Sequence, residues 1–167
     1  MAKRQAISPV IATVIIVAVT IAVAIAVAFW MTGIIGLFTG FEQLTIDAIN
    51  AVPTILPGGF PGWEVSVTVT NRGTSPTSIT HIYINGYLAW DIGGIIIVGC
   101  PALFGVDVDP PAGAGAIPFN PGESRTITLT ITKGGTCGPT TLNPGGSVEV
   151  KLHTSGGKDY PKLVVLP

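Results

Sequence analysis

Charged residues are scarce in this chain of 167 residues, where Asp, Glu, Lys and Arg together make up 10%. Lys3 and Arg4 are the only adjacent basic residues, and no charged residue follows them until Glu42. Nucleic acids are bound mainly by clustered Lys and Arg, so a net charge of −1 without another basic run argues against such a ligand. The hydrophobic content of 47% excludes a disordered tail.

Residues that carry catalysis or bind metals are also few, with two histidines, two cysteines and two methionines. His81 and His153 fall on expected strands, and no G-x-S-x-G turn offers a nucleophile. A blue-copper site needs two His, a Cys and usually a Met, but both methionines precede the segment that holds the other ligands. We therefore expect no enzymatic activity, no cofactor and no metal site.

An uncharged stretch dominates the N-terminal part of the chain, with 37 residues from Gln5 to Phe41. As one helix it would be about 55 Å long at 1.5 Å per residue. The hydrocarbon core of a bilayer is only about 30 Å thick. Because the helix is longer than the bilayer core, it needs a second apolar environment. We interpret this environment as a bundle of identical helices.

Three interpretations of this stretch compete: a secretory signal peptide, a single-pass anchor, and a pilin-type helix behind a short basic leader. Ala24-Ile25-Ala26 satisfies the A-x-A cleavage rule, but the apolar run is longer than a signal peptide needs. Pro9 suits the first turn of a helix, and Ser8 before it is a good N-cap. Lys3 and Arg4 should stay in the cytoplasm, so that the part of the chain after the hydrophobic stretch is exported. The third interpretation is favoured.

Small residues recur inside this helix at a spacing of four, at Ala18, Ala22 and Ala26. Such residues let apolar helices approach closely where no water drives them together, so these three are predicted to pack helix against helix. Three threonines are expected to hydrogen-bond back to their own helix: Thr13, Thr20 and Thr32. Pro53 must end the helix, and we place its end between Ile46 and Val52.

The remainder of the chain has the pattern of β-strands. Strict alternation of apolar and polar residues predicts strands over 63–70, 126–133 and 147–154. Asn85-Gly86 predicts a type I′ hairpin, and a last strand at an edge is expected over 160–166. The fold class is therefore α+β, with a long hydrophobic helix before an antiparallel, immunoglobulin-like β-sandwich. We assign 1–6 to a leader, 7–50 to the assembly and membrane helix, and 51–167 to the head.

Both cysteines, Cys100 and Cys137, lie in the expected head. If the head is exported, a disulfide between them is the natural interpretation, and the alternative is two unrelated buried thiols. Cys100 belongs to an apolar, Gly- and Pro-rich segment from Gly93 to Phe119. This segment is expected either to pack across the head or to form a contact surface for a neighbouring subunit.

The N-terminus KRQAISPVIA, from Lys3 to Ala12, resembles that of archaeal type IV pilins, in which basic residues and a small residue precede an I/L-S-P-V-I/V-A run. The resemblance covers about the first 40 residues. It implies that a class III prepilin peptidase recognises four leader residues, Arg4, Gln5, Ala6 and Ile7, and cuts between Ala6 and Ile7. Gln5 stands where a basic residue is usual, and a cut between Gln5 and Ala6 is the alternative.

The same resemblance implies a structural subunit of an extracellular pilus. We expect the pilus to serve adhesion, and the sequence leaves DNA exchange, motility and virus attachment open as alternatives. The subunit would be inserted in the cytoplasmic membrane first, and then polymerise through its helix into a helical filament of identical subunits. A prepilin peptidase, a cytoplasmic assembly ATPase and a membrane platform protein would be its partners. The rival interpretation is a single-pass, membrane-anchored binding module displayed singly at the cell surface.

Overall fold

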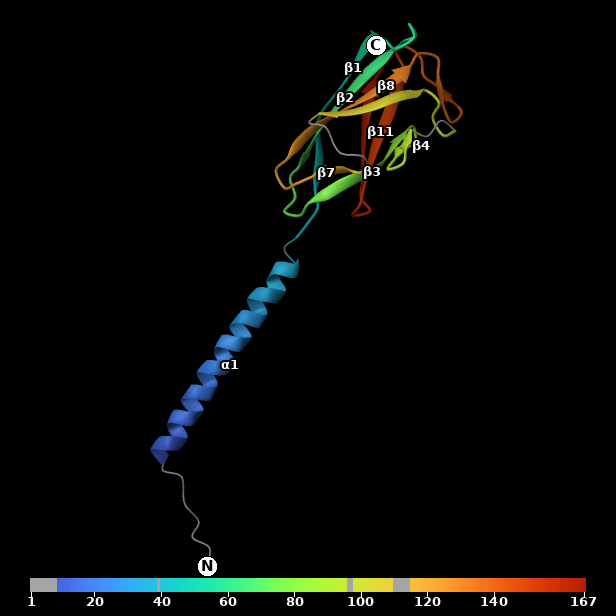
Figure 1. Ribbon diagram of the computed structural model, residues 1–167. Coiled ribbons are helices and arrows are strands. Elements are labelled where there is room, and N and C mark those ends of the chain that lie inside the picture. The colour runs from blue at the N-terminus through green and yellow to red at the C-terminus, as the bar shows by residue number, and fades with distance from the viewer. Residues whose placement is uncertain (1–8, 39, 96–97, 110–114) are drawn as a thin grey trace, which may run out of the picture. The chain divides into compact units, whose positions relative to one another are not determined.

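The computed structural model describes residues 9–38, 40–95, 98–109 and 115–167. The chain divides into two units, Met1–Gly40 and Phe41–Pro167, and each is described by itself. The first unit contains one helix, and the second, called the head below, contains antiparallel β-sheets (Figure 1). The expected fold class, an apolar N-terminal helix followed by a β-sandwich-like head, is confirmed.

Helix α1 (Pro9–Phe38) is 30 residues long, which corresponds to about 45 Å. It begins at the proline that the sequence places in its first turn. Its three hydroxyls return to its own backbone as expected, since Thr13 Oγ1 and Thr20 Oγ1 donate to carbonyls three residues earlier at 2.8 Å. Thr32 Oγ1 donates to the carbonyl oxygens of Phe29, at 3.0 Å, and Ala28, at 3.1 Å. The helix therefore satisfies its polar side chains without outside partners.

The expected end of the helix between Ile46 and Val52 is wrong. The helix ends at Phe38, and strand β1 (Leu44–Ile55) occupies the region assigned to its last turns. β1 pairs along its length with β2 (Pro61–Asn71), with a bulge between Ile46 and Ala48. Pro53 lies inside β1, opposite Trp63, which a sheet tolerates because β1 is an edge strand. The long cross-strand ladder outweighs the local helix propensity of this segment.

The head consists of two main antiparallel sheets. In the first, called sheet A, the order is β1, β2, β8 (Ser124–Thr132) and β6 (Leu103–Asp109). In the second, sheet B, the order is β12 (Asp159–Val165), β11 (Ser147–Thr154), β3 (Thr77–Ile84), β4 (Tyr87–Asp91) and β5 (Gly94–Ile95). β7 (Ile117–Phe119) also pairs with β3, while β9 (Thr136–Cys137) and β10 (Thr140–Thr141) form a small separate ribbon.

The hydrophobic core lies between sheets A and B. The alternating apolar residues of β2, β8 and β11 face it as the sequence predicts, and Val65, Ile127 and Leu152 are fully buried. Trp63 is also buried, and its indole Nε1 donates to the carbonyl oxygen of Pro167 at 2.8 Å. The Asn85-Gly86 hairpin is confirmed, because it joins β3 to β4 with φ of 52° and 82°, as a type I′ turn requires.

The segment from Gly93 to Phe119 packs in part across the head, as one of the two expectations has it, and its role as a contact surface for a neighbouring subunit stays a prediction. It supplies β5, β6 and β7, and three of its residues, Cys100, Leu103 and Phe119, are buried in the core. Val98, by contrast, is 97% exposed. Part of the segment completes the sandwich, while another part presents apolar side chains to the surroundings.

Asn71 at the end of β2 is a buried side chain that joins the loop between β2 and β3 to the end of β7. Its Nδ2 donates to the carbonyls of Ser75 (2.9 Å) and Phe119 (3.3 Å), and its Oδ1 accepts from Gly73 N at 2.9 Å. We expect Asn71→Ala to lower the free energy of unfolding by about 2–3 kcal/mol, because it leaves buried backbone groups without partners.

Denaturant unfolding followed by circular dichroism of the strands checks this prediction. Asn50→Ala, at an exposed position on β1, is the matched control and should change stability by no more than about 0.5 kcal/mol. Equal destabilisation by the two variants would contradict the role given to Asn71.

Candidate functional site

The candidate functional site is the surface of α1, which is apolar on all sides. No charged residue occurs in it, and its large side chains from Val10 to Ile35, except the half-buried Ile34, are exposed. A helix that is hydrophobic all round belongs inside a protein core or in a membrane. By length and composition, residues 9–35 qualify as a membrane span.

The predicted packing residues Ala18, Ala22 and Ala26 lie along one side of α1, because residues four apart are neighbours on a helix surface. They leave a shallow strip between larger Ile and Val side chains. A second helix can approach closely along such a strip. Whether these residues pack against another copy stays a prediction, since the structure contains one chain.

The four leader residues, Arg4, Gln5, Ala6 and Ile7, lie outside the described residues. The expected N-cap Ser8 also lies outside them. The cleavage between Ala6 and Ile7 therefore stays a prediction from the resemblance.

Cys100 and Cys137 are joined as a disulfide, and both are fully buried. Backbone hydrogen bonds flank it on both sides, from Ala102 N to Thr136 O and from Gly138 N to Gly99 O, each 3.2 Å long. The bond therefore fixes the segment that follows β5 to the β9–β10 ribbon.

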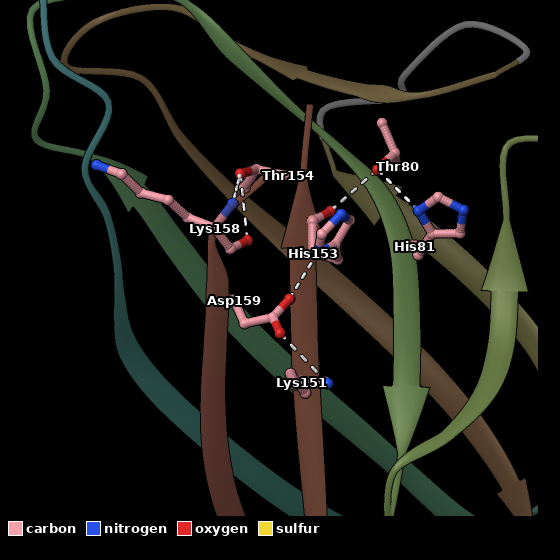
Figure 2. Close-up of polar contacts among 7 residues, drawn as sticks. All are labelled: Thr80, His81, Lys151, His153, Thr154, Lys158 and Asp159. Atoms are coloured by element: carbon pink, nitrogen blue, oxygen red, sulfur yellow. Dashed lines mark hydrogen bonds and ion pairs between the residues drawn. The ribbon is translucent and has the colours of Figure 1, made fainter. Parts of the chain in front are cut away.

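The two histidines of the chain meet on the outer face of sheet B. The strand register places Asp91, His81, His153 and Asp159 in one row across β4, β3, β11 and β12. The imidazole ring centres are 5.5 Å apart. Figure 2 shows Asp159 reaching both His153 Nδ1, at 2.6 Å, and Lys151 Nζ, at 3.4 Å.

Thr80 lies between the two histidines in the same view. Its hydroxyl donates to the backbone oxygen of His153 at 3.3 Å, and its oxygen lies 2.9 Å from His81 Nδ1. Within the described part of the chain, no group of three or more His, Cys, Asp or Glu side chains is arranged to hold a metal ion. Thr80 and Lys151 join three members of the row, His81, His153 and Asp159, in a hydrogen-bonded surface network. The sequence pattern does not reveal this network, because it depends on strand register.

The neighbours of Asp159 in this row lower its pKa, which can be measured. The hydrogen bond from His153 holds the pKa of Asp159 below its ordinary value of 3.8, partial desolvation opposes this, and Lys151 adds to it. Because the folded pKa is depressed, the stabilisation is present above the unfolded pKa, near 3.8, and is lost as the pH falls through the folded value. We expect His153→Ala to raise the pKa of Asp159.

Carboxyl chemical shifts of the full chain in detergent micelles, recorded against pH, measure this change. His81→Ala is the matched control, because His81 does not contact Asp159, and it should leave the pKa of Asp159 unaltered. An unchanged Asp159 titration in the His153 variant would refute the assignment.

The chain matches no protein-family model and no curated protein. Several solved structures are similar to it. The apo PCuAC domain from PmoF1 has a TM-score of 0.44 and 12% identity, with 76% of this chain and 98% of that chain covered.

Two filament structures are similar over more of the chain. The archaeal flagellum of Methanospirillum hungatei strain JF1 has a TM-score of 0.41 and 15% identity, with coverage of 94% of this chain and 88% of that one. The Iho670 flagellar-like filament has a TM-score of 0.36 and 16% identity, with coverage of 95% and 98%. With TM-scores below 0.5, these likenesses carry no argument about the activity of this chain.

Proposed function

We propose that this chain is the structural subunit of an extracellular helical filament of the archaeal type IV pilus kind, in which α1 forms the core. The observation that carries the proposal is the exposed apolar surface of α1 from Val10 to Ile35, which has no polar side. At about 45 Å, the helix exceeds the hydrocarbon core by about 15 Å. A bundle of identical helices covers the whole length, whereas a bilayer alone covers about two thirds of it.

The energetics of such an assembly depend on close packing. Exchanging lipid tails for equally apolar helices changes the hydrophobic free energy little, so van der Waals contact between helices decides the balance. The strip formed by Ala18, Ala22 and Ala26 brings backbones close together. The internally bonded threonine hydroxyls of α1 leave no unpaired donor to oppose burial.

The proposal includes a membrane stage before assembly. The N-terminal resemblance supports insertion with Lys3 and Arg4 in the cytoplasm, removal of the leader by a prepilin peptidase, and extrusion by an assembly ATPase with a membrane platform protein. The head is then displayed outside the cell, where its role is adhesion. We propose no catalytic role for the chain.

Electron microscopy of the purified material tests the proposal. Helical filaments several nanometres wide are expected, together with an intact mass that begins at Ile7 or Ala6. Dispersed monomers in detergent that retain Met1 would instead support the rival, a singly displayed membrane-anchored binding module.

A further inference from the structure

The outer face of sheet B contains a β-bulge beside its two histidines. The register of β3 against β11 shifts there, so that His81 lies opposite His153 while Ile79 lies opposite Thr154. Thr80 is the extra residue, and both Thr80 and His81 are half-buried, whereas the residues on either side of them are buried in the core. The bulge therefore turns two consecutive side chains, Thr80 and His81, to the same outer face.

The hydrogen bonds of Thr80 assign the tautomer of His81. The Thr80 hydroxyl has one hydrogen, which it donates to the backbone oxygen of His153 at 3.3 Å. Its oxygen lies 2.9 Å from His81 Nδ1 and must therefore accept a hydrogen from that nitrogen (Figure 2). With the hydrogen on Nδ1, the neutral imidazole has its lone pair on Nε2.

Asp159 assigns the same tautomer to His153. An ionised carboxylate only accepts hydrogen bonds, so the contact of 2.6 Å between Asp159 Oδ1 and His153 Nδ1 places the ring hydrogen on Nδ1. Lys151 Nζ lies 3.4 Å from the other carboxylate oxygen and helps to hold Asp159 in place. Within the part of the chain that the structure describes, no hydrogen bond reaches Nε2 of either histidine.

Histidines that bind metal ions have this arrangement. In such sites the second ring nitrogen donates to a carboxylate, a backbone carbonyl or a water, which fixes the tautomer and orients the ring. Asp159 provides a carboxylate for His153, and the Thr80 oxygen takes the place of a water for His81. Both rings thus present an unpaired Nε2 on one face of the sheet.

The distance between the rings also suits a shared ion. An imidazole nitrogen binds Zn²⁺ at about 2.0–2.1 Å, which puts the ring centre about 3.2 Å from the ion. Two rings on one ion then have centres about 4.5 Å apart at a right angle and about 6.4 Å apart on opposite sides. The observed separation is 5.5 Å. The rings meet edge to face, at 64°, so the His81 ring has to rotate about its side-chain bonds to bring its Nε2 to the ion. Side chains at a protein surface make such rotations within nanoseconds.

We infer that His81 and His153 form a surface site for a divalent late transition-metal ion, which binds Nε2 of both rings. Imidazole suits Zn²⁺, Ni²⁺ and Cu²⁺, whereas Mg²⁺ and Ca²⁺ prefer oxygen ligands. The row contains two carboxylates, Asp91 and Asp159, against the single charge of Lys151, so the surroundings favour a cation.

The remaining coordination positions belong to water or a small ligand. Among the described residues, no third His, Cys, Asp or Glu side chain completes the set. The inference reverses the expectation that the chain has no metal site. That expectation came from the number of possible ligands in the sequence, which does not contain the strand register that brings His81 and His153 together.

Titration of the full-length chain in detergent micelles with Cu²⁺ tests this site, because Cu²⁺ binds nitrogen ligands most tightly among these ions. Electron paramagnetic resonance reports how many nitrogens bind the ion. We expect one Cu²⁺ per chain with two imidazole nitrogens. With Zn²⁺, the ¹⁵N chemical shifts should change most at Nε2 of both rings, and binding through Nδ1 would overturn the assigned tautomers.

The histidine variants provide the second readout. His81→Ala and His153→Ala should each abolish the spectrum of two nitrogens. Each should also lower the affinity for Cu²⁺ by at least the roughly 10–100-fold that the loss of an outer hydrogen-bond partner costs. Glu64→Gln, which removes an exposed carboxylate from the outer face of sheet A, is the matched control and should leave the affinity unchanged.

Thr80 and Asp159 are positioning residues, which the variants Thr80→Val and Asp159→Ala test. Both variants keep the two ligands, so the spectrum of two nitrogens should remain, while the affinity for Cu²⁺ falls by about 10–100-fold. Thermal unfolding checks that the head stays folded. An unchanged affinity in both variants would overturn the role given to these two side chains.

The outcomes also separate this site from non-specific binding. Equal Cu²⁺ binding by the wild type and by both histidine variants would mean an adventitious ion only and would overturn the inference. A spectrum with one nitrogen in the wild type would overturn it as well, because the register predicts that both rings bind. The test does not depend on filament formation, so its failure would leave the proposed function standing.

Discussion

Ala22→Glu is expected to yield no filaments while the head folds normally. Ala22 lies in the middle of α1, far from either end, so its side chain cannot reach water once the helix is surrounded by others. Burying an unpaired carboxylate costs several kcal/mol. In lipid the cost is smaller, because a lone helix can shift, thin the bilayer locally or admit water to the carboxylate, whereas the surrounding helices of the polymer prevent this.

Membrane insertion should survive this substitution. An acidic residue at the centre of a span costs about 2.5–3.5 kcal/mol, whereas each Leu, Ile, Val or Phe contributes about −0.3 to −0.6 kcal/mol, and α1 has many of these. Membrane fractionation therefore separates failed assembly from failed insertion. Filament counts by electron microscopy and thermal unfolding of the head provide the two main measurements.

Three controls isolate the cause. Ala22→Ser keeps a small uncharged side chain and should assemble, while Ala22→Leu is apolar but bulky and should assemble less well if close approach matters. Ala48→Glu makes the same replacement at an exposed position of the head and should leave filaments intact. Normal filaments from Ala22→Glu would refute a buried helix core.

The strands that the sequence predicts share a strict alternation of apolar and polar residues. The local geometry of a strand is enough to interpret this pattern. Val65, Val67 and Val69 face the core because every second residue of a strand points to the same side. The Asn85-Gly86 turn is equally local, since two successive residues with positive φ select a tight hairpin. Such features need no knowledge of distant parts of the chain.

β1 could not be found in this way. Its residues 45–51, TIDAINA, suit the end of a helix as well as a strand, and the burial along β1 does not alternate cleanly. Its conformation is decided by pairing with β2 across the hairpin, which no local pattern encodes. The same limit applies to β5, β6 and β7, where Gly and Pro obscure the alternation.

The candidate site also contains features that the local sequence predicts and features that only the folded chain produces. The helix and its alanines follow from composition and spacing, whereas the row through His81 and His153 depends on the register of β3 against β11.

Removing the disulfide by Cys100→Ala with Cys137→Ala is expected to lower the free energy of unfolding by roughly 3–4 kcal/mol. The bond closes a loop with a sequence separation of 37, and a loop of that length restricts the unfolded chain by about this amount. Since small domains are stable by only about 5–15 kcal/mol, the loss is a large share of the total. The melting temperature should fall by about 10 °C.

Alanine is the better replacement at both positions, because the sites are fully buried and a serine hydroxyl there would add the cost of an unpaired polar group. Denaturant unfolding of the wild type with and without reductant gives an independent measurement of the same quantity. Reductant should destabilise the wild type and leave the double variant unaffected. If the double variant unfolds at the same denaturant concentration as the oxidised wild type, the stabilising role of the bond is wrong.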